Sequence, residues 1–291
     1  MSVLEYSADS FFTIGDSHSV CQDYALSSDK LPFASLSDGC SSNPHSDIGS
    51  RILVSKLNHL VNRGYSLDNS KEFAFKSKFA LENLGYSPDN LNATLMSVGI
   101  VEEDGVKSFK VQGFGDGLVV ARYRDSQDFY VTDIKYPSGA PFYLSYLTDD
   151  RVLNGWKNKY SPKIELSTYN LDCEKSTVTP IMDLTLDKGF KPENGDFQYS
   201  EEFDLDSYDL VLAISDGIHS FTKKDHSLRP YSRPITSDVP FLEILPCLLD
   251  FKVMNGVFIQ RRMSKFLEHC KKNNLSHYDD LSIAGLYVKS F

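Results

Sequence analysis

Apolar side chains recur at helical spacing in two stretches of the first third of the chain. From about residue 46 to 63, one face carries isoleucine, leucine and valine, and Gly64 stands where a C-terminal cap belongs. A second stripe runs from about 70 to 84 and includes Phe75 and Phe79. Both stretches are predicted to be amphipathic helices whose apolar faces pack against a core.

The pattern changes to strict alternation in residues 93–136. Apolar and polar side chains alternate there, and Asp or Gly interrupts them at 103–105, 115–117 and 125–126. Such breaks are typical of hairpin turns, because Gly adopts positive φ freely and Asp bonds its own backbone. This region is therefore predicted to form consecutive hairpins in an antiparallel sheet.

The last third contains one apolar strand, one helix and a closing strand. Residues 208–221, "YDLVLAISDGIHSF", are strongly apolar up to an Asp-Gly step, and 281–288 form the predicted last strand. Residues 240–274 are predicted to be helical. The apolar face of that helix carries Ile259, Met263, Phe266, Leu267 and Cys270.

Length and composition predict one folded domain. The chain has 291 residues, of which 41% are hydrophobic, enough to bury a sizeable core. No Pro-, Gly- or Ser-rich linker divides it, so we expect a single domain over 1–291. Surface insertions are expected around 138–206 and 222–256, where no clear periodicity is present.

Charge and cysteine usage exclude several classes of function. A net charge of -10 and a pI near 5.2 argue against nucleic acid or an anionic membrane as partner. The 5 cysteines are scattered without a CxxC pair, which fits a reducing compartment. The first residues lack a signal peptide, and no apolar run approaches the ~18 residues of a membrane span. We expect a soluble, cytoplasmic protein.

Aspartate stands at the ends of the predicted strands. Asp38, Asp116 and Asp216 each follow an apolar run, and Asp279 and Asp23 each precede one. A single Asp-Gly step is ordinary turn chemistry, but Asp is costly to bury unpaired. Several such residues together are better explained by convergence on a cation.

Oxygen ligands without softer donors indicate Mg²⁺ or Mn²⁺, which prefer octahedral coordination. The glycine after Asp38 lets the backbone approach closely enough for its own carbonyl to bind. Two such ions about 3.5 to 4 Å apart can hold a bridging hydroxide and clamp the oxygens of a phosphate. The pattern therefore predicts metal-assisted phosphate chemistry.

Five short motifs occur in a recognisable order along the chain. They are Gln22-Asp23, "SLSDGCSS", "GFGDG", "LAISDGIHSF" and "DDLS". In this order, from about Gly15 to Val288, the chain resembles the metal-dependent Ser/Thr protein phosphatases of the PP2C type, in a divergent, bacterial-type form. The resemblance implies an α+β fold, a four-layer α/β/β/α sandwich of two antiparallel sheets flanked by helices.

The resemblance also implies an activity. Relatives hydrolyse phosphoserine and phosphothreonine monoesters of protein substrates by attack of a metal-bridging hydroxide. They use two Mn²⁺ or Mg²⁺ ions and bind a third more weakly, and self-contained members are monomers. No organic cofactor is expected, since "GFGDG" is not followed by the helix of a nucleotide loop.

Metal ligands carry over from the family residue by residue. Asp38 would bridge two metals, with the Gly39 carbonyl on one of them. Asp216 and Asp279 would bind the other metal. Asp116 would help to hold the third, weaker ion.

Catalytic roles carry over to Asp38, Asp23 and His18. Asp23 would act on metal-bound water and is also placed among the metal site residues. His18 stands five residues before Asp23, where many relatives have a phosphate-contacting Arg, although a lone His is more often structural. Asp280 occupies a position that is often Asn in the family, and a supporting role is expected for it.

Three departures from the family pattern keep a second interpretation open. Gln22 stands where some relatives have a Glu ligand, and Gly117 replaces the usual Ser. Cys40 stands where eukaryotic relatives have a His proposed as general acid, so His18, His45 or bound water would have to supply that proton. The alternative is a catalytically weak or inactive metal-binding or phospho-recognition module that acts through a protein partner.

Overall fold

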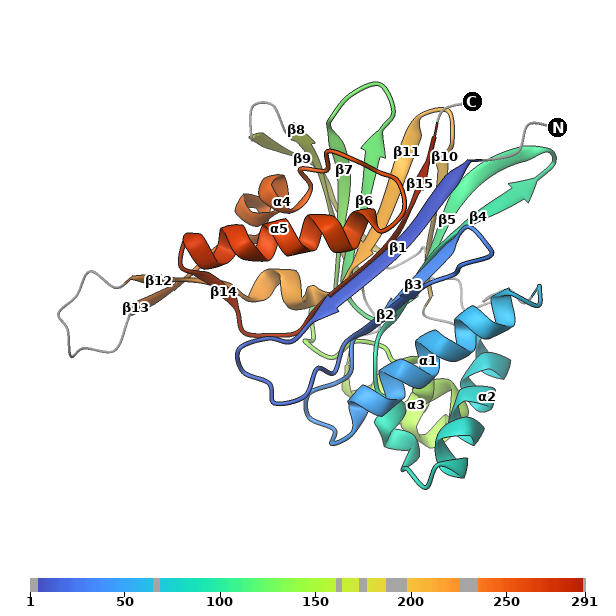
Figure 1. The fold of residues 1–291 in the computed structure, drawn as a ribbon. Helices are drawn as coiled ribbons and strands as arrows, with labels where there is room; N and C mark the ends of the chain where they lie inside the picture. The colour runs from blue at the N-terminus through green and yellow to red at the C-terminus, as the bar shows by residue number, and fades with distance from the viewer. Residues whose placement is uncertain are drawn as a thin grey trace.

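The computed structural model describes residues 5–64, 69–160, 164–172, 177–186, 198–225 and 235–289. Within these ranges, two antiparallel sheets pack face to face, with helices on both outer faces (Figure 1). The main core lies between the sheets, where Leu36 and Val98 of one sheet join Val211 and Ala284 of the other. The expected α/β/β/α sandwich is confirmed.

The larger sheet has seven strands in the order β1-β15-β11-β6-β7-β8-β9. Their bounds are β1 Tyr6–Thr13, β6 Gly117–Tyr123, β7 Phe129–Lys135, β8 Ile164–Asp172, β9 Thr177–Leu186, β11 Tyr208–Ile214 and β15 Leu281–Val288. The smaller sheet has five strands in the order β10-β5-β4-β3-β2. Their bounds are β2 Tyr24–Ser27, β3 Phe33–Ser37, β4 Leu95–Glu103, β5 Val106–Phe114 and β10 Tyr199–Asp204.

Two pairs of helices form the outer layers (Figure 1). The pair α1 and α2 covers the five-stranded sheet, and the pair α4 and α5 covers the seven-stranded sheet, where it builds a second apolar cluster. The helices are α1 Ser46–Val61, α2 Ser70–Asn83, α3 Asp150–Lys159, α4 Phe241–Leu248 and α5 Phe258–Lys272, with short 3-10 helices η2 Pro88–Leu91, η3 Leu144–Thr148 and η4 Asp216–Ser220. None of the helices that the structure describes combines the length and the apolar character needed to cross a bilayer.

A three-stranded sheet, which the sequence pattern does not indicate, extends from the far end of α5 (Figure 1). Its strands are β12 Phe221–Asp225, β13 Ile235–Asp238 and β14 Leu275–His277. Part of the stretch 222–256, where insertions were expected, lies outside the described residues. The described part holds β13 and α4.

The other stretch with expected insertions, 138–206, contributes to both sheets. Strands β8 and β9 belong to the larger sheet and β10 to the smaller one. Phe142 and Trp156 from this stretch are buried in the main core. Residues 187–197 lie outside the described part of the chain.

Three predictions about local structure are wrong. Phe75 and Phe79 were expected on the core-facing stripe of α2, but both are exposed, and Phe73 and Leu81 are buried in their place. Residues 240–274 form two helices, α4 and α5, separated by the irregular segment 249–257, in which Gly256 has a φ of 54°. The break at 115–117 is not a hairpin turn: β5 and β6 lie in different sheets, and the turn carries the chain from one sheet to the other. The hairpin at 103–105 is confirmed, with Asp104 and Gly105 both at positive φ.

Strand β1 closes the larger sheet and is tied to α5 through one carboxylate. It pairs with β15 along its whole length, from Tyr6 opposite Val288 to Thr13 opposite Leu281. The Asp9 side chain is buried and accepts hydrogen bonds from the backbone N–H groups of Ile259 (2.6 Å) and Gln260 (3.0 Å). These are free N–H groups of the first helical turn, so Asp9 fixes the start of α5 against the sheet.

Glycine permits close packing of α1 on η2. A methyl group on Gly49 would lie 1.7 Å from the carbonyl oxygen of Asn90, whereas one on Gly155 in α3 would meet no atom within 4 Å. We expect Gly49→Ala to lower the free energy of unfolding by about 2–3 kcal/mol through overpacking. Gly155→Ala, the matched control, should raise it by about 0.5–1 kcal/mol, since Ala is the better helix former. Urea unfolding followed by circular dichroism measures both, and equal effects would contradict the packing argument.

Candidate metal centre

Strand register brings two of the aspartates together at one end of the smaller sheet. Tyr24 at the start of β2 lies opposite Ser37 at the end of β3. Asp23 and Asp38, the next residues outward on each strand, are therefore neighbours. Asp23 is fully buried, whereas part of the Asp38 side chain remains accessible although protein surrounds it closely.

The larger sheet places the other aspartates at the corresponding end. Ile214 at the end of β11 lies opposite both Leu118 in β6 and Ile283 in β15. Asp216, which follows β11, therefore lies near the start of both neighbouring strands. Asp116 precedes β6 and Asp279 precedes β15. Because Asp116 also forms the connection from β5 to β6, the two sheet ends meet at this turn.

Backbone hydrogen bonds fix the Asp38-Gly39 step. The Asp38 N–H donates to Thr94 Oγ1 (3.0 Å), and its carbonyl accepts from the Thr94 N–H (2.8 Å). A side chain on Gly39 would come within 2.9 Å of the backbone of Gln22 and Ser46. Only glycine fits there, which explains the Asp-Gly pair in packing terms.

A second set of contacts fixes Asp216 against the start of β15. The Ser215 N–H donates to the Ser282 carbonyl (2.9 Å), and the Ser282 N–H donates to Ser215 Oγ (2.9 Å). A methyl group on Gly217 would lie 1.8 Å from the carbonyl oxygen of Asp280. In both Asp-Gly steps, the glycine is in close contact with the backbone of another segment, and this contact holds the preceding aspartate in place.

Asp280 organises the loop that carries His18 and Asp23. Its two carboxylate oxygens accept hydrogen bonds from the N–H groups of Gly15 (2.8 Å) and Gln22 (2.6 Å). His18 Nδ1 lies 3.0 Å from Asp280 Oδ2, and His18 Nε2 lies 3.7 Å from Asp279 Oδ1. His18 is therefore beside the carboxylates, and Asp280 supports the site by holding the loop with both of its oxygens.

Burial and mutual repulsion dominate the electrostatics of the site. Burial, with the charge of Asp216 added to it, raises the pKa of Asp23 to about 7. Burial and then Asp216 likewise raise the pKa of Asp116 to about 7. The pKa of Asp38 is raised well above its usual range by burial and by the charges of Asp23 and Asp216, and that of Asp279 is raised by the same two kinds of cause.

These carboxylates lack neutralising partners. Neither side-chain oxygen of Asp23 has a well-formed hydrogen bond in the structure, and the same holds for Asp216 Oδ1. Within the described ranges, no three His, Cys, Asp or Glu side chains are arranged as ligands of a single ion. Hard carboxylate oxygens, buried and unpaired, are nevertheless the donors that a small divalent cation prefers, so the residues fit such ions.

Gln22, Cys40 and His45 do not supply a missing charged group. The Gln22 side-chain amide donates to Ser46 Oγ (2.9 Å), which directs it toward α1. The Cys40 thiol lies 3.1 Å from Ser42 Oγ. His45 packs its ring against Tyr86, at 5.5 Å between centroids, at the start of α1.

Sequence analysis missed a buried Asp–His pair beside Asp116. His219 Nε2 lies 3.1 Å from Asp133 Oδ1, and Lys135 Nζ lies 2.7 Å from Asp133 Oδ2. Asp133 is buried in β7, and its charge contributes to the raised pKa of Asp116. The signal available in the sequence was an Asp inside an otherwise apolar strand, where Asp is rare.

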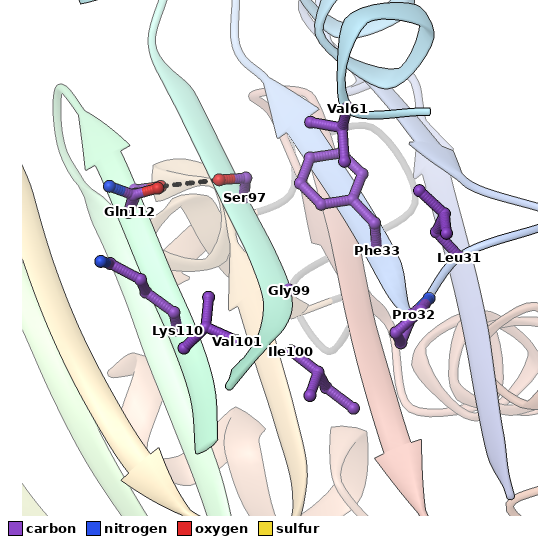
Figure 2. A pocket seen from close by; sticks show the side chains of 10 residues that line it. All are labelled: Leu31, Pro32, Phe33, Val61, Ser97, Gly99, Ile100, Val101, Lys110 and Gln112. Carbon is purple, nitrogen blue, oxygen red and sulfur yellow. Dashed lines mark hydrogen bonds between the residues drawn. The ribbon is translucent and has the colours of Figure 1, made fainter. Parts of the chain in front are cut away.

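A groove of about 220 Å³ lies elsewhere, on the outer face of the five-stranded sheet (Figure 2). Figure 2 shows Lys110 and Gln112 of β5 beside Gly99 of β4, with Phe33 and Val61 across from them. No carboxylate lines this groove. It is separate from the aspartates and offers no ligands for a hard cation.

Comparisons with known proteins agree with this arrangement. The sequence model of the family described as protein phosphatase 2C matches residues 14–243 of this chain. No curated protein matches the sequence. Several solved bacterial phosphatases are similar in fold along nearly the whole chain.

The serine/threonine phosphatase of S. agalactiae is 14% identical, with a TM-score of 0.50 over 99% of this chain and 100% of that chain. The serine/threonine phosphatase Stp1 of Staphylococcus aureus is 12% identical, with a TM-score of 0.50 over 99% and 96%. PppA of Pseudomonas aeruginosa is 11% identical, with a TM-score of 0.52 over 98% of each chain. At these identities the likeness concerns the fold.

The family match covers most of the chain and spans four of the five aspartates that the fold gathers at the sheet ends. The alternative of a non-catalytic module is not favoured by these findings. The chain belongs to the protein phosphatase 2C family, and its function is that of a phosphatase.

Proposed function

We propose that this phosphatase hydrolyses phosphomonoesters on serine and threonine residues of proteins, with two Mn²⁺ or Mg²⁺ ions in the carboxylate site. The observation that carries this proposal is the set of crowded, unneutralised carboxylates of Asp23, Asp38 and Asp216. Holding like charges together raises the free energy of the folded protein. A bound divalent cation would remove that cost.

Four residues would hold the two principal ions. Asp38 is central, because both Asp23 and Asp216 lie close enough to raise its pKa. The Gly39 carbonyl follows it directly, and Asp216 and Asp279 would complete the donors from the larger sheet. Asp116 would help to hold a third ion. When bound, such ions lower the pKa of water and polarise phosphoryl oxygens.

Asp23 and His18 would handle the proton and the phosphate. The side-chain oxygens of Asp23 lack well-formed hydrogen bonds and are therefore free to accept a proton from the attacking water. Asp280 holds the loop between the two residues, so His18 keeps its place beside Asp279. His18 would contact the phosphoryl group from this side.

We also propose a substrate class, a location and an oligomeric state for the enzyme. The substrate would be a phosphorylated protein, as membership of the family implies. We place the enzyme in the cytoplasm as a monomer. The four cysteines in the described part of the chain are free thiols, which fits a reducing environment.

The first prediction concerns turnover of para-nitrophenyl phosphate. The wild-type chain should hydrolyse it with Mn²⁺ or Mg²⁺ and lose the activity in EDTA. Asp38→Ala and Asp216→Asn should each lower kcat/KM by about 100-fold or more, since each removes charge that positions the ions.

The matched control is Asp150→Asn, which removes an exposed carboxylate from α3. It should leave turnover unchanged. Full activity in Asp38→Ala would refute the assignment of the bridging ligand, and activity that survives EDTA would refute the metal dependence.

A second prediction concerns the stability of the metal-free protein as the pH rises. Asp23 and Asp116 have a pKa raised to about 7 in the folded state, against an ordinary value of 3.8. Between these values the folded state binds more protons than the unfolded state, so the free energy of unfolding falls as the pH rises. Thermal unfolding in EDTA should therefore show a Tm that decreases from about pH 5 to about pH 8.

Added Mn²⁺ should restore the Tm, and more strongly at the higher pH, because only ionised carboxylates bind it. Asp38→Asn should weaken both effects, since it removes one of the repelling charges. A metal-free Tm that stays level over this range would show that the carboxylates do not repel one another as described.

A further inference from the structure

A glycine in the middle of β4 lies on the floor of the groove on the outer face of the five-stranded sheet (Figure 2). A glycine inside a strand weakens it, and its usual reasons are a bulge or bend, a backbone that comes close, or a ligand that does. Gly99 is neither at a bulge nor at positive φ, because β4 pairs with β3 and β5 through it without a shift of register.

Close packing does not require this glycine either. Among the described residues, a methyl group on Gly99 would meet only the Phe33 ring at 3.4 Å and the Pro32 carbonyl oxygen at 3.9 Å. Both are ordinary contact distances, unlike the 1.7 Å that a methyl group on Gly49 would face. Of the usual reasons for a strand glycine, the approach of a ligand is the one that remains.

Apolar side chains surround the space above Gly99. Helix α1 ends at Val61 and does not continue across this part of β4 and β5. The space of about 220 Å³ is therefore enclosed by the sheet face, the helix end and the segment before β3. Its apolar lining residues are Leu31, Pro32, Phe33, Val61, Ile100 and Val101. Such a lining favours the apolar part of a ligand.

One cation stands at the edge of the groove. Lys110 of β5 lies directly opposite Gly99, and Figure 2 shows its side chain running along this edge toward Gln112. Its side chain is 20% exposed, and its Nζ lies 3.6 Å from Glu202 Oε1, which is too long for a hydrogen bond. The other oxygen of Glu202 accepts from Ser108 Oγ (3.2 Å).

The Lys110 ammonium therefore has hydrogen-bonding capacity to offer. In the part of the chain that the structure describes, its contact with a carboxylate is this one long ion pair. An ammonium carries three donors, and a charge that is largely withdrawn from water is costly unless it is paired. No carboxylate lines the groove itself, so an anion from outside would find this cation available.

These features together define the chemistry of the ligand. The lining calls for an apolar body, and the single cation calls for a single negative charge at one end of it. A carboxylate accepts strong hydrogen bonds from an ammonium, whereas a phosphate monoester brings more charge than one lysine balances.

We propose that the groove binds a small organic carboxylate, with its apolar part over Gly99 and its carboxylate on the Lys110 ammonium. The groove is separate from the aspartates at the sheet ends, so this inference does not depend on the proposed function.

The test is calorimetric titration of the full chain with acetate, butanoate, hexanoate and phenylacetate, each in Mn²⁺ and again in EDTA. From acetate to hexanoate, affinity should rise about 4-fold for each added methylene. Hexanol, which lacks the charge, should bind about 10-fold more weakly than hexanoate. Affinities should be equal in Mn²⁺ and in EDTA. Binding that requires Mn²⁺ would belong to the metal centre and overturns the inference, as does the absence of binding by both hexanoate and phenylacetate.

Two variants locate the site. Gly99→Val places a side chain in the groove and should weaken hexanoate binding by about 10-fold or more, with a Tm that is unchanged or higher, because Val is the better strand residue. Lys110→Met keeps the apolar stem and removes the charge, so its affinity for hexanoate should fall to that for hexanol.

The matched control is Lys107→Met on the same strand. The Lys107 ammonium lies 3.7 Å from Glu102, and this residue does not line the groove. Its loss should leave hexanoate binding unchanged. Wild-type affinity in folded Gly99→Val overturns the inference. An equal loss in the two lysine variants also overturns it, because it shows a general effect of charge. If Gly99→Val fails to fold, the comparison of the two lysine variants still decides.

Discussion

Repulsion between buried carboxylates is the constraint on which the rest of this structure depends. Asp23 is fully buried, and Asp38 and Asp216 lie close enough to it to disturb its ionisation. Such a group stays together only if the surrounding backbone leaves it no room to separate. Hydrogen bonds of Thr94 to the Asp38 step, and of Ser215 to Ser282, supply that confinement. The two sheets and their core therefore hold these carboxylates close together, although their charges repel one another.

The adjacent residues Asp279 and Asp280 have different surroundings and therefore different tasks in the site. Asp280 is almost fully buried and uses both oxygens on backbone N–H groups of the loop 15–22. Asp279 remains partly accessible and faces the charge of Asp216. Two identical side chains thus take different tasks because the backbone turns them toward different neighbours. A sequence motif alone does not distinguish these tasks.

Much of the fold could be predicted from local pattern, and the failures share a cause. Helix α1 has a clear apolar stripe, and the turn at Asp104-Gly105 has the residues that its positive φ values require. Helix α2 was also predicted, but on the wrong face, since Phe75 and Phe79 are exposed. The turn at 115–117 has similar chemistry, yet it joins two sheets, because pairing partners are chosen by distant strands. Strand β1 was missed for the same reason: its alternation is weak, and its partner β15 lies at the other end of the chain.

The residues of the site also fall into those that the sequence predicts and those that it does not. The aspartates were predicted because each stands at a strand end beside a turn, where its position is visible in the sequence. Asp133 and His219 were not, because only the packing of β7 and η4 brings them together near Asp116. No spacing rule connects residues that lie on different elements.

The pairing of β1 with β15 also governs when the site can exist. The loop that carries His18 and Asp23 is held by hydrogen bonds from Gly15 and Gln22 to Asp280, across 265 and 258 positions of the chain. Contacts of such long range form late in folding, because the entropy of closing a long loop must be overcome before they contribute. During synthesis, residues 15–23 leave the ribosome long before their partners do. The carboxylates from the two ends of the chain can therefore meet only once β15 has been synthesised and has joined the larger sheet.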